Sequence, residues 1–287
     1  MSKKRFLAFI PISFLLILFL SSSTQAAAIS FDFNDMLTGL FGVKKTEEFH
    51  KTLPLKAEGS FSLKNVNGSI TIRTWKEEKV EIRATKTTKH DPKKLKEVKI
   101  EIESVQDSIQ VNTVYPKLRN IRVSVNYEVS VPEGVNLGKI KSVNGDVTLS
   151  GPFGSVKASS TNGGVKLEGA SGKITLSTTN GSLEASGVRG LLEAGTTNGS
   201  IFLGLDTLED ELKAKTVNGG ITLRLQSKKI DADLEARTVN GKIHFDFPVT
   251  FKTIMKSRRS LEGQIGQGGV GISLRTVNGS IKIIREE

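Results

Sequence analysis

The chain has 287 residues, enough for a large core or an extended repeat array, and it contains no cysteine. Disulfides, thiol chemistry and a cysteine-linked lipid anchor are therefore excluded. The formal charge is +11, and +8 remains once the three basic residues near the amino terminus are set aside. Positive charge favours contact with anionic polymers or lipid headgroups, although lysine on exposed strands also serves solubility. Nucleic acid is not expected as a partner, because no aromatic stacking platform accompanies the basic residues.

Residues 1–28 have the pattern of an export signal. A short basic segment, Lys3 to Arg5, precedes an apolar run from Phe6 to Leu20, and small residues up to Ala28 fit a cleavage site. The apolar run has 15 residues, short of the roughly 20 that cross a bilayer, so we expect cleavage. The mature protein is then expected to be periplasmic, cell-surface or secreted, without a transmembrane span. An uncleaved signal that tethers the protein to the membrane is the alternative.

Residues 29–50 are expected to form a linker or a short amphipathic helix. Phe31 to Val43 places apolar residues at helical spacing, so this helix would cover one end of the fold or contact a membrane surface. Residues 51–137 are β-rich, with a turn at Pro132, and we expect them to cap the repeats that follow and to continue the same core. The expected strands of this cap are Val80–Lys86, Val98–Val105, Ser108–Val114 and Ile121–Val131.

Residues 138–287 contain a repeat that is marked by the dipeptide Asn-Gly. Asn144, Asn162, Asn180 and Asn198 are separated by 18 residues each, and the spacing then widens to 20 and 22. A fixed short period with the same turn residues indicates a repeat architecture. The eight Asn-Gly turns of the chain are Asn67-Gly68, Asn144-Gly145, Asn162-Gly163, Asn180-Gly181, Asn198-Gly199, Asn218-Gly219, Asn240-Gly241 and Asn278-Gly279.

After each Asn-Gly pair, apolar and polar residues alternate with the period of a half-buried strand. After Asn162, for example, Val165 and Leu167 are expected to face inward and Lys166 outward. A second alternating strand follows a Gly-rich corner, and its last inward position carries a hydroxyl. The expected inward hydroxyls are those of Ser160, Thr178, Thr196, Thr216, Thr238 and Thr276.

The sequence therefore predicts an all-β fold, a β-solenoid of two-strand coils of about 18 residues with an N-terminal β-rich cap. Parallel coils about 4.8 Å apart would place like residues over like residues. We expect the asparagine amides to form a buried ladder between coils, and the glycines to supply the left-handed backbone of a tight corner. An antiparallel β-meander or sandwich is the alternative, because Asn-Gly also favours two-residue hairpins.

No catalytic, cofactor-binding or metal-binding residues are predicted. His50, His90 and His244 have dissimilar surroundings without ligand spacing, and no nucleophile motif is present. Acidic residues do not cluster on a repeated face, which argues against a paired-carboxylate glycosidase and a calcium-binding repeat. We therefore expect neither a cofactor nor a metal ion.

The segment VSVNYEVSVPEGVNL, the VNGDVTLSG and TNG repeats, and the closing GGVGISLRTVNGSIKI together resemble a bacterial family. This is a β-repeat family of unknown function whose members are named as adhesins, and it is related to the head domains of auto-transporter adhesins. The resemblance covers Leu55 to Ile284. It implies an exported β-solenoid at the cell envelope, with adhesion as the proposed role, and it brings no catalytic residues.

The leading hypothesis is a non-enzymatic envelope protein whose rigid scaffold binds a macromolecule: a glycan, a lipid headgroup or a protein. A structural or signalling accessory of the envelope and a carbohydrate-active enzyme on a β-helix are the alternatives. Between Phe251 and Gly271 the period lapses, and we expect a basic loop that projects from the array. The predicted contact surface, including that loop, consists of Lys157, Lys166, Lys213, Lys215, Arg224, Arg237, Arg258 and Arg259.

Overall fold

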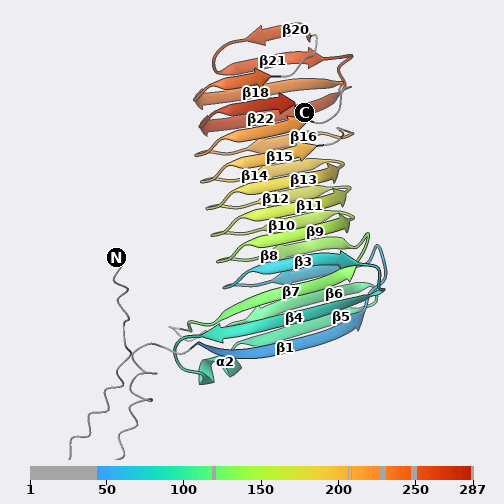
Figure 1. Ribbon diagram of the computed structural model, residues 1–287, viewed down its shortest axis with the longest axis vertical. Helices are drawn as coiled ribbons and strands as arrows, with labels where there is room; N and C mark the ends of the chain where they lie inside the picture. Colours follow the sequence, from blue (N-terminus) through green and yellow to red (C-terminus); the bar gives the residue numbers. More distant parts are fainter. Residues whose placement is uncertain are drawn as a thin grey trace, which may run out of the picture. The chain divides into compact units, whose positions relative to one another are not determined.

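Two β-sheets that face each other make up almost the whole of the described chain (Figure 1). The computed structural model describes residues 44–117, 121–205, 207, 209–225, 231–246 and 251–285, with the backbone alone for 251–256. These residues belong to one unit, Gly42–Glu287. The export signal expected at 1–28 and the helix expected at 31–43 lie outside the described residues. None of the helices within them is long and apolar enough to span a membrane.

Each sheet is a long ladder of hydrogen-bonded strands. In spatial order, the first sheet contains β1 (Lys45–Pro54), β4 (Lys79–Thr88), β7 (Ser124–Pro132), β3 (Ile70–Trp75), β9 (Val147–Phe153), β11 (Val165–Ser171), β13 (Leu183–Arg189), β15 (Ile201–Leu205), β17 (Ile221–Leu225), β23 (Ile281–Arg285) and β19 (Ile243–Asp246). The second sheet, given from the opposite end of the stack, contains β20 (Phe251–Lys256), β21 (Ser260–Ile265), β18 (Ala232–Asn240), β22 (Val270–Asn278), β16 (Leu212–Lys215), β14 (Leu192–Gly195), β12 (Ile174–Ser177), β10 (Val156–Ser159), β8 (Asn136–Lys141), β2 (Ser60–Lys64), β6 (Ser108–Val114) and β5 (Lys99–Val105).

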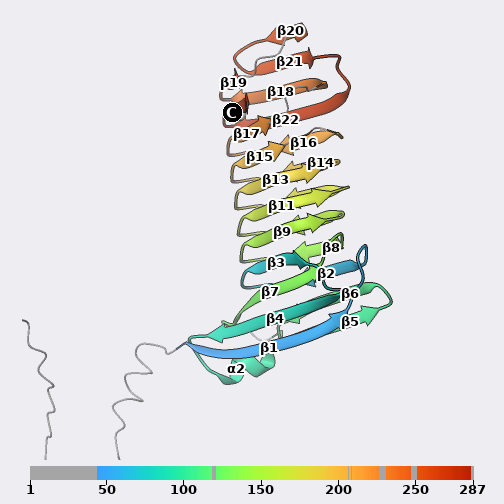
Figure 2. The same cartoon turned by 45° about the vertical axis from the view of Figure 1, so that its right-hand side comes forward.

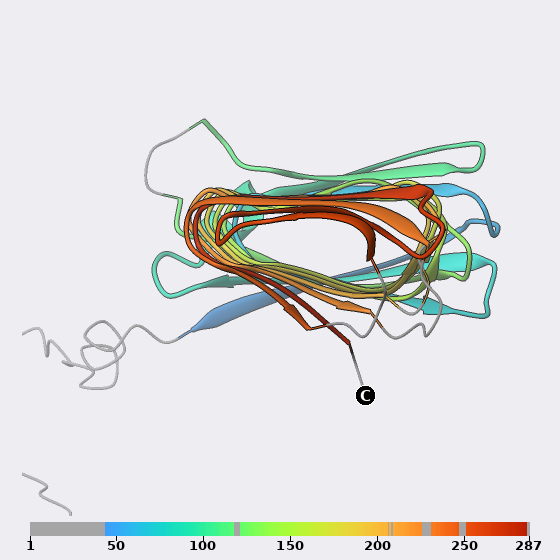
Figure 3. The ribbon, with the colours of Figure 1, turned by 90° about the horizontal axis from the view of Figure 1, so that it is seen from above.

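The repeats form a parallel stack, as the solenoid prediction requires. Each coil gives one strand to each sheet, and equivalent residues lie in register, so that Val165 is beside both Val147 and Leu183. Seen from above, successive coils superpose as flattened rings (Figure 3). Within the described residues, antiparallel pairs are confined to the two ends of the stack, where β1, β4 and β5 lie at one end and β20 and β21 at the other. The antiparallel meander is therefore wrong for the repeats.

The core lies between the sheets and is built from the residues that alternation places inward. Val165, Leu167 and the equivalent residues of the other inner coils are fully buried. Ile243 and Phe245 are only half-buried, because β19 is the last strand of the first sheet. In the inner coils β9 to β17 the inward positions that follow each Asn-Gly pair are Val, Ile, Leu or Ala, which carry no polar atom that would need a partner.

The order of the coils in space differs from their order in the sequence at both ends (Figure 2). The coil of β2 and β3 lies between the coil of β6 and β7 and the coil of β8 and β9. Likewise the last coil, β22 and β23, lies between the coil of β16 and β17 and the coil of β18 and β19. This insertion explains why Asn67 and Asn278 stand outside the regular spacing and yet occupy regular places in the stack.

All eight asparagines of the Asn-Gly pairs form one continuous ladder. Except at Asn67, which only accepts, each amide nitrogen donates to the side-chain oxygen of the preceding asparagine at 2.7–2.8 Å, in the spatial order 67, 144, 162, 180, 198, 218, 278, 240. The ladder is exposed, except at half-buried Asn67, so the prediction of a buried ladder is wrong. The chain turns before the asparagine and carries its side chain to the outside of the corner, where water can share the remaining hydrogen bonds.

The hydroxyl column is the buried polar feature of each corner, as predicted. The hydroxyls of Ser142 and of the six predicted residues donate to the glycine carbonyl of the adjacent coil at 2.8–3.1 Å. Asn65 takes the same place at the N-terminal end of the stack and donates to the carbonyl of Val125 at 2.7 Å. Because a buried carbonyl without a partner is costly, the column requires a short donor at every coil.

The glycine of each corner is required by the closeness of the next coil. Gly181 does not have a left-handed backbone, which corrects the prediction for that position. A Cβ built on Gly181 would overlap the carbonyl oxygen of Gly163, and the other Asn-Gly glycines are similarly crowded by a backbone carbonyl. At Gly181 the stacking of coils, and not the backbone conformation, therefore excludes a side chain. Positive φ values of 117–159°, which favour glycine as predicted, occur at Gly68, Gly145, Gly163, Gly199 and Gly219.

The ladder predicts which Asn-Gly pair deamidates first. Deamidation requires the glycine nitrogen to attack the asparagine side-chain carbon, with loss of ammonia and formation of a succinimide. In seven pairs this nitrogen donates to the next asparagine's carbonyl at 2.8–3.1 Å, whereas the described residues give the Gly241 N–H no partner. Peptide mapping by mass spectrometry at mildly alkaline pH should therefore find deamidation at Asn240 before any other site. The unfolded chain, in which all eight pairs are free, is the control, and equal rates in the folded protein would contradict this protection.

The N-terminal cap contains the predicted strands together with an additional edge strand. Strand β1 begins at Lys45, inside the segment expected to be a linker or helix, and pairs along its whole length with β4. Lys86 of β4 points inward and is buried, and its ammonium donates to Glu47 of β1 at 2.8 Å and to the carbonyl of Leu95 at 3.3 Å. Leu95 lies in α2 (Lys93–Glu97), so this one lysine joins the edge strand and the helix to the cap.

The C-terminal region after Phe251 forms a second cap, where a projecting loop was expected. Strands β20 and β21 form a hairpin, and β21 pairs antiparallel with β18. The carbonyls of Arg258 and Arg259 accept hydrogen bonds from the backbone N–H groups of Ile243 and Thr238, in the coil of β18 and β19, at 3.1 and 2.9 Å. The 18-residue period lapses here because the hairpin covers the end of the second sheet. The prediction of a projecting loop is therefore wrong.

Candidate functional site

Three basic residues occupy adjacent positions on the outer face of the second sheet. Lys215 of β16 lies in register with Arg275 of β22, and Arg275 lies in register with Arg237 of β18. Neighbouring strands are about 4.8 Å apart, so three cations gather within roughly 10 Å. The insertion of β22 between β16 and β18 creates this column, which we call the basic column.

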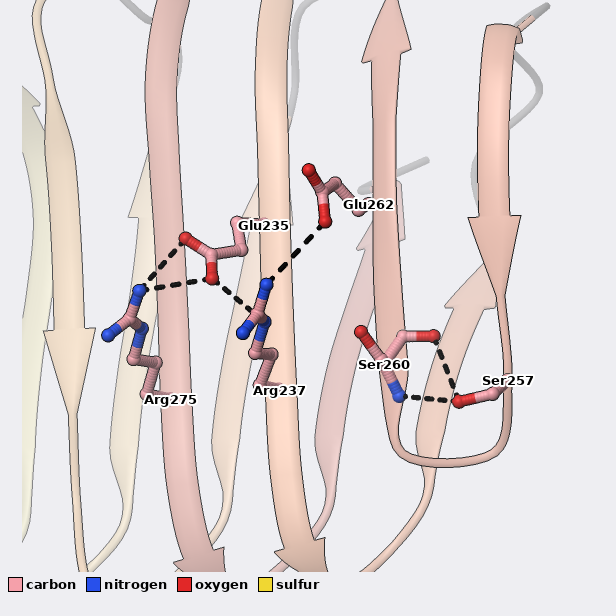
Figure 4. Close-up of polar contacts among 6 residues, drawn as sticks. All are labelled: Glu235, Arg237, Ser257, Ser260, Glu262 and Arg275. Atoms are coloured by element: carbon pink, nitrogen blue, oxygen red, sulfur yellow. Dashed lines mark hydrogen bonds and ion pairs between the residues drawn. The ribbon is translucent and has the colours of Figure 1, made fainter.

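Like charges on neighbouring strands repel each other, and two glutamates offset this repulsion (Figure 4). Arg275 donates to both carboxylate oxygens of Glu235 at 3.0 Å. The Nε of Arg237 lies 2.9 Å from Glu235, and its terminal nitrogen lies 3.6 Å from Glu262. Lys215 forms no ion pair with any residue that the structure describes, so the column retains an excess of positive charge.

The hairpin turn beside the column carries two further arginines and is held by a serine. Ser257 Oγ accepts a hydrogen bond from the backbone N–H of Ser260 at 3.0 Å and donates to the carbonyl of Ser260 at 3.4 Å (Figure 4). It also accepts a hydrogen bond from the backbone N–H of Arg259 at 3.3 Å. This local bonding fixes the turn that presents Arg258 and Arg259 next to the coil of β18 and β19. The basic column therefore continues onto the turn.

The surface around the column is hollowed. One hollow of about 490 Å³ is lined by Lys215, Arg275, Arg237 and Arg259 together with valine side chains, of which Val239 is 54% exposed. A second hollow of about 470 Å³ shares Lys215 and Arg275 and continues along the stack, because the outward residues of the next coils are small. The small outward residues are Ser177 and Gly195. The two hollows form a shallow trough parallel to the stack.

The opposite edge of the same face is acidic. A hollow of about 520 Å³ is lined by Glu211, Asp233, Glu235 and Glu262. A hydrogen bond from Lys213 to Glu211 at 2.7 Å raises the pKa of this lysine. The charge of this outer face thus changes from negative near the Gly-rich corners to positive near the Asn-Gly corners. An anionic ligand would therefore be directed to the basic side.

The structure divides the residues of the predicted contact surface between opposite faces, so they do not form one continuous surface. Lys157, Lys213, Lys215 and Arg237 lie on the second sheet. Lys166 and Arg224 lie on the first sheet. Lys166 is also neutralised by Glu168 and Glu184, each at 3.1 Å, which raises the pKa of the lysine.

Arg275, the central residue of the column, was not among the predicted contact residues, and neither were Lys64 and Lys141 of the same row. Lys64 pairs with Lys141 in register, and both stand three residues before an Asn-Gly pair, as do Lys215, Arg237 and Arg275. Alignment of all eight turns at this position would have found the row. The order of its members in space required the strand topology.

The described residues contain no group of three or more His, Asp or Glu side chains that could hold a metal ion. His50 is bonded to Glu81 at 2.8 Å, and His244 lies on the outer face of β19, far along the sheet. Among the residues that the structure describes, no hydrogen bond joins the ring of either histidine to a serine or threonine hydroxyl.

The fold and this face define a β-solenoid with a charged, shallow outer surface. The chain belongs to the Toastrack DUF4097 family, whose sequence pattern matches residues 42–284. No curated protein matches the chain.

Three solved structures are similar to the chain at low identity. A proposed cell adhesion protein from Clostridium sporogenes is 16% identical, with a TM-score of 0.36 over 84% of this chain and 100% of that one. A proposed adhesin from Bacteroides fragilis is 10% identical, with a TM-score of 0.40 over 84% and 97%. A proposed lipid-binding protein from Parabacteroides distasonis is 11% identical, with a TM-score of 0.38 over 84% and 97%. None of these three is named as an enzyme.

Proposed function

We propose that the protein is an exported, non-enzymatic component of the cell envelope that binds an anionic glycan chain along the basic column. The observation that supports this is the register of Lys215, Arg275 and Arg237, which lie on three adjacent strands beside a trough of small side chains. The signal-like sequence pattern of residues 1–28 supports the location.

The direction of the trough favours an extended polymer. Cations repeat at one strand spacing along the stack, so a linear polyanion that follows the trough meets several of them in succession. A rigid parallel stack holds these groups in place before binding, which reduces the entropy that is lost when the ligand is ordered. Binding through exposed charges is expected to weaken in salt, because the Debye length falls from about 10 Å at 0.1 M to about 3 Å at 1 M.

The test compares dextran sulfate with neutral dextran. The protein is expected to bind dextran sulfate and not dextran in low salt, and to release it in moderate salt. The double variant Lys215→Gln/Arg275→Gln should weaken binding roughly tenfold, which corresponds to about 1.4 kcal/mol. Arg237 remains paired with Glu235 in this variant, so no buried charge is left alone. Calorimetry measures the affinity.

The matched control removes two charges from the opposite face, in Arg224→Gln/Lys282→Gln. Both residues face outward on the first sheet, so this variant should bind dextran sulfate nearly as well as the unaltered protein. An equal loss in the two variants would show that net charge, and not the column, determines binding. Binding to anionic vesicles without binding to dextran sulfate would replace the glycan with a lipid headgroup. Binding that ignores salt would overturn the electrostatic basis.

A further inference from the structure

A separate hollow lies on the outer face of the first sheet, near the N-terminal end of the stack. It has a volume of about 410 Å³ and is formed by three adjacent strands, β4, β7 and β3. Ser130 of β7 occupies the centre, in register with Glu81 of β4 on one side and Arg73 of β3 on the other. The two walls are two strand spacings apart, roughly 9–10 Å between backbones, and the small serine leaves the space between them open.

Trp75, the single tryptophan of the chain, forms part of one wall. Its indole N–H donates to the carbonyl of Lys79 at 2.8 Å, and the ammonium of Lys79 lies 5.4 Å from the ring centroid. Both contacts fix the orientation of the ring before any ligand arrives. The side chain is half-buried, so part of the ring remains available at the hollow.

The polar groups of the hollow differ in whether they already have partners. Arg73 lies between Ser130 and Ser150 and forms no ion pair with any residue that the structure describes. The carboxylate of Glu81 is hydrogen-bonded to Arg83 at 2.9 Å and to His50 at 2.8 Å. Both bonds lower the pKa of this carboxyl group, the one to Arg83 more than the one to His50. Glu128 and Thr71 supply a further carboxylate and a hydroxyl group.

We propose that this hollow binds one sugar unit of a glycan, with the ring against Trp75 and an acidic or hydroxyl substituent on Arg73. Sugar rings present an apolar C–H face and a rim of hydroxyl groups. A fixed aromatic ring can pack against the apolar C–H face, and convergent carboxylates and guanidinium donors can form hydrogen bonds with the hydroxyl groups of the rim. Of the described residues that line the hollow, Arg73 is the cation without a partner, so a sugar that carries a carboxylate is expected to bind more tightly than its neutral counterpart.

The tryptophan itself reports the site, because its fluorescence is the only tryptophan signal of the protein. Titration with a galacturonic acid tetramer should give a saturable change, and the neutral galactose tetramer should bind several-fold more weakly. The variant Arg73→Gln should abolish this preference while it leaves the neutral sugar unaffected. The variant Ser130→Tyr, which fills the hollow from an outward position, should abolish the saturable change for both sugars.

Controls separate this site from the basic column and from misfolding. Circular dichroism and the melting temperature of each variant should match those of the unaltered protein, because Arg73 and Ser130 lie on the outer face. The variant Lys215→Gln/Arg275→Gln, on the opposite sheet, should leave the titration unchanged. The inference would be overturned if neither tetramer gave a saturable change, or if the change persisted undiminished in Ser130→Tyr. Neither result would bear on dextran sulfate binding.

Discussion

Replacing Gly181 with valine is expected to lower the free energy of unfolding by about 3 kcal/mol or more. Any Cβ at this position would overlap the carbonyl oxygen of Gly163, which is part of the neighbouring backbone and has no rotamer by which to move away. The two coils would have to separate, and the side-chain hydrogen bond between Asn180 and Asn162 at 2.8 Å would be lost with them. Chemical denaturation measures the change.

The next residue is the control, because Ser182 is exposed on the same corner. Ser182→Val is expected to change the free energy of unfolding by less than about 0.5 kcal/mol. The chain already contains this comparison: the position after the Asn-Gly pair is Asp146, Gly164, Ser182 or Lys242 in different coils, whereas the glycine before it never varies. Equal losses in the two variants would mean that crowding between coils does not select glycine.

The repeat made most of the fold predictable. Val165 and Leu167 could be placed inside, and Thr178 in a buried column, because a strand alternates with a period of two and a stack repeats the result at each coil. The Asn162 amide was placed on the wrong side because alternation was continued through the corner. A turn interrupts the pleat, so the period of the strand does not carry across it.

The order of the strands was beyond the reach of local patterns. Arg275 and Lys215 are 60 residues apart in the sequence, and they become neighbours only because β22 is inserted beside β16. Nothing in the periodicity distinguishes this arrangement from sequential stacking, since every coil presents the same edge to its neighbour. For the same reason only part of the basic column was predicted. The hollow at Trp75, which is lined by residues of β3, β4 and β7, was not predicted.

Removing a whole coil is expected to be tolerated better than removing a single residue. Deletion of residues 162–179 takes out β11 and β12 and joins Thr161 to Asn180, so that β9 meets β13 and β10 meets β14 with equivalent residues in register. The ladder and the hydroxyl column lose one member each and remain continuous. Because a repeat array gains stability roughly as a sum of coils and their interfaces, we expect cooperative unfolding with a modestly lower melting temperature.

Deletion of Lys166 alone should be far more damaging. It would turn Leu167 outward and Glu168 inward, or else shift the corner and break the ladder. Loss of a buried leucine contributes about 2–5 kcal/mol by itself. Melting temperatures of the two deletion proteins test this ranking, and a lower value for the 18-residue deletion than for the single deletion would contradict the parallel stack.

The shorter array keeps Lys215, Arg275 and Arg237 on adjacent strands and brings them one coil closer to Lys141. Dextran sulfate binding should therefore survive the loss of the coil, which would assign it to the local column and not to the length of the solenoid.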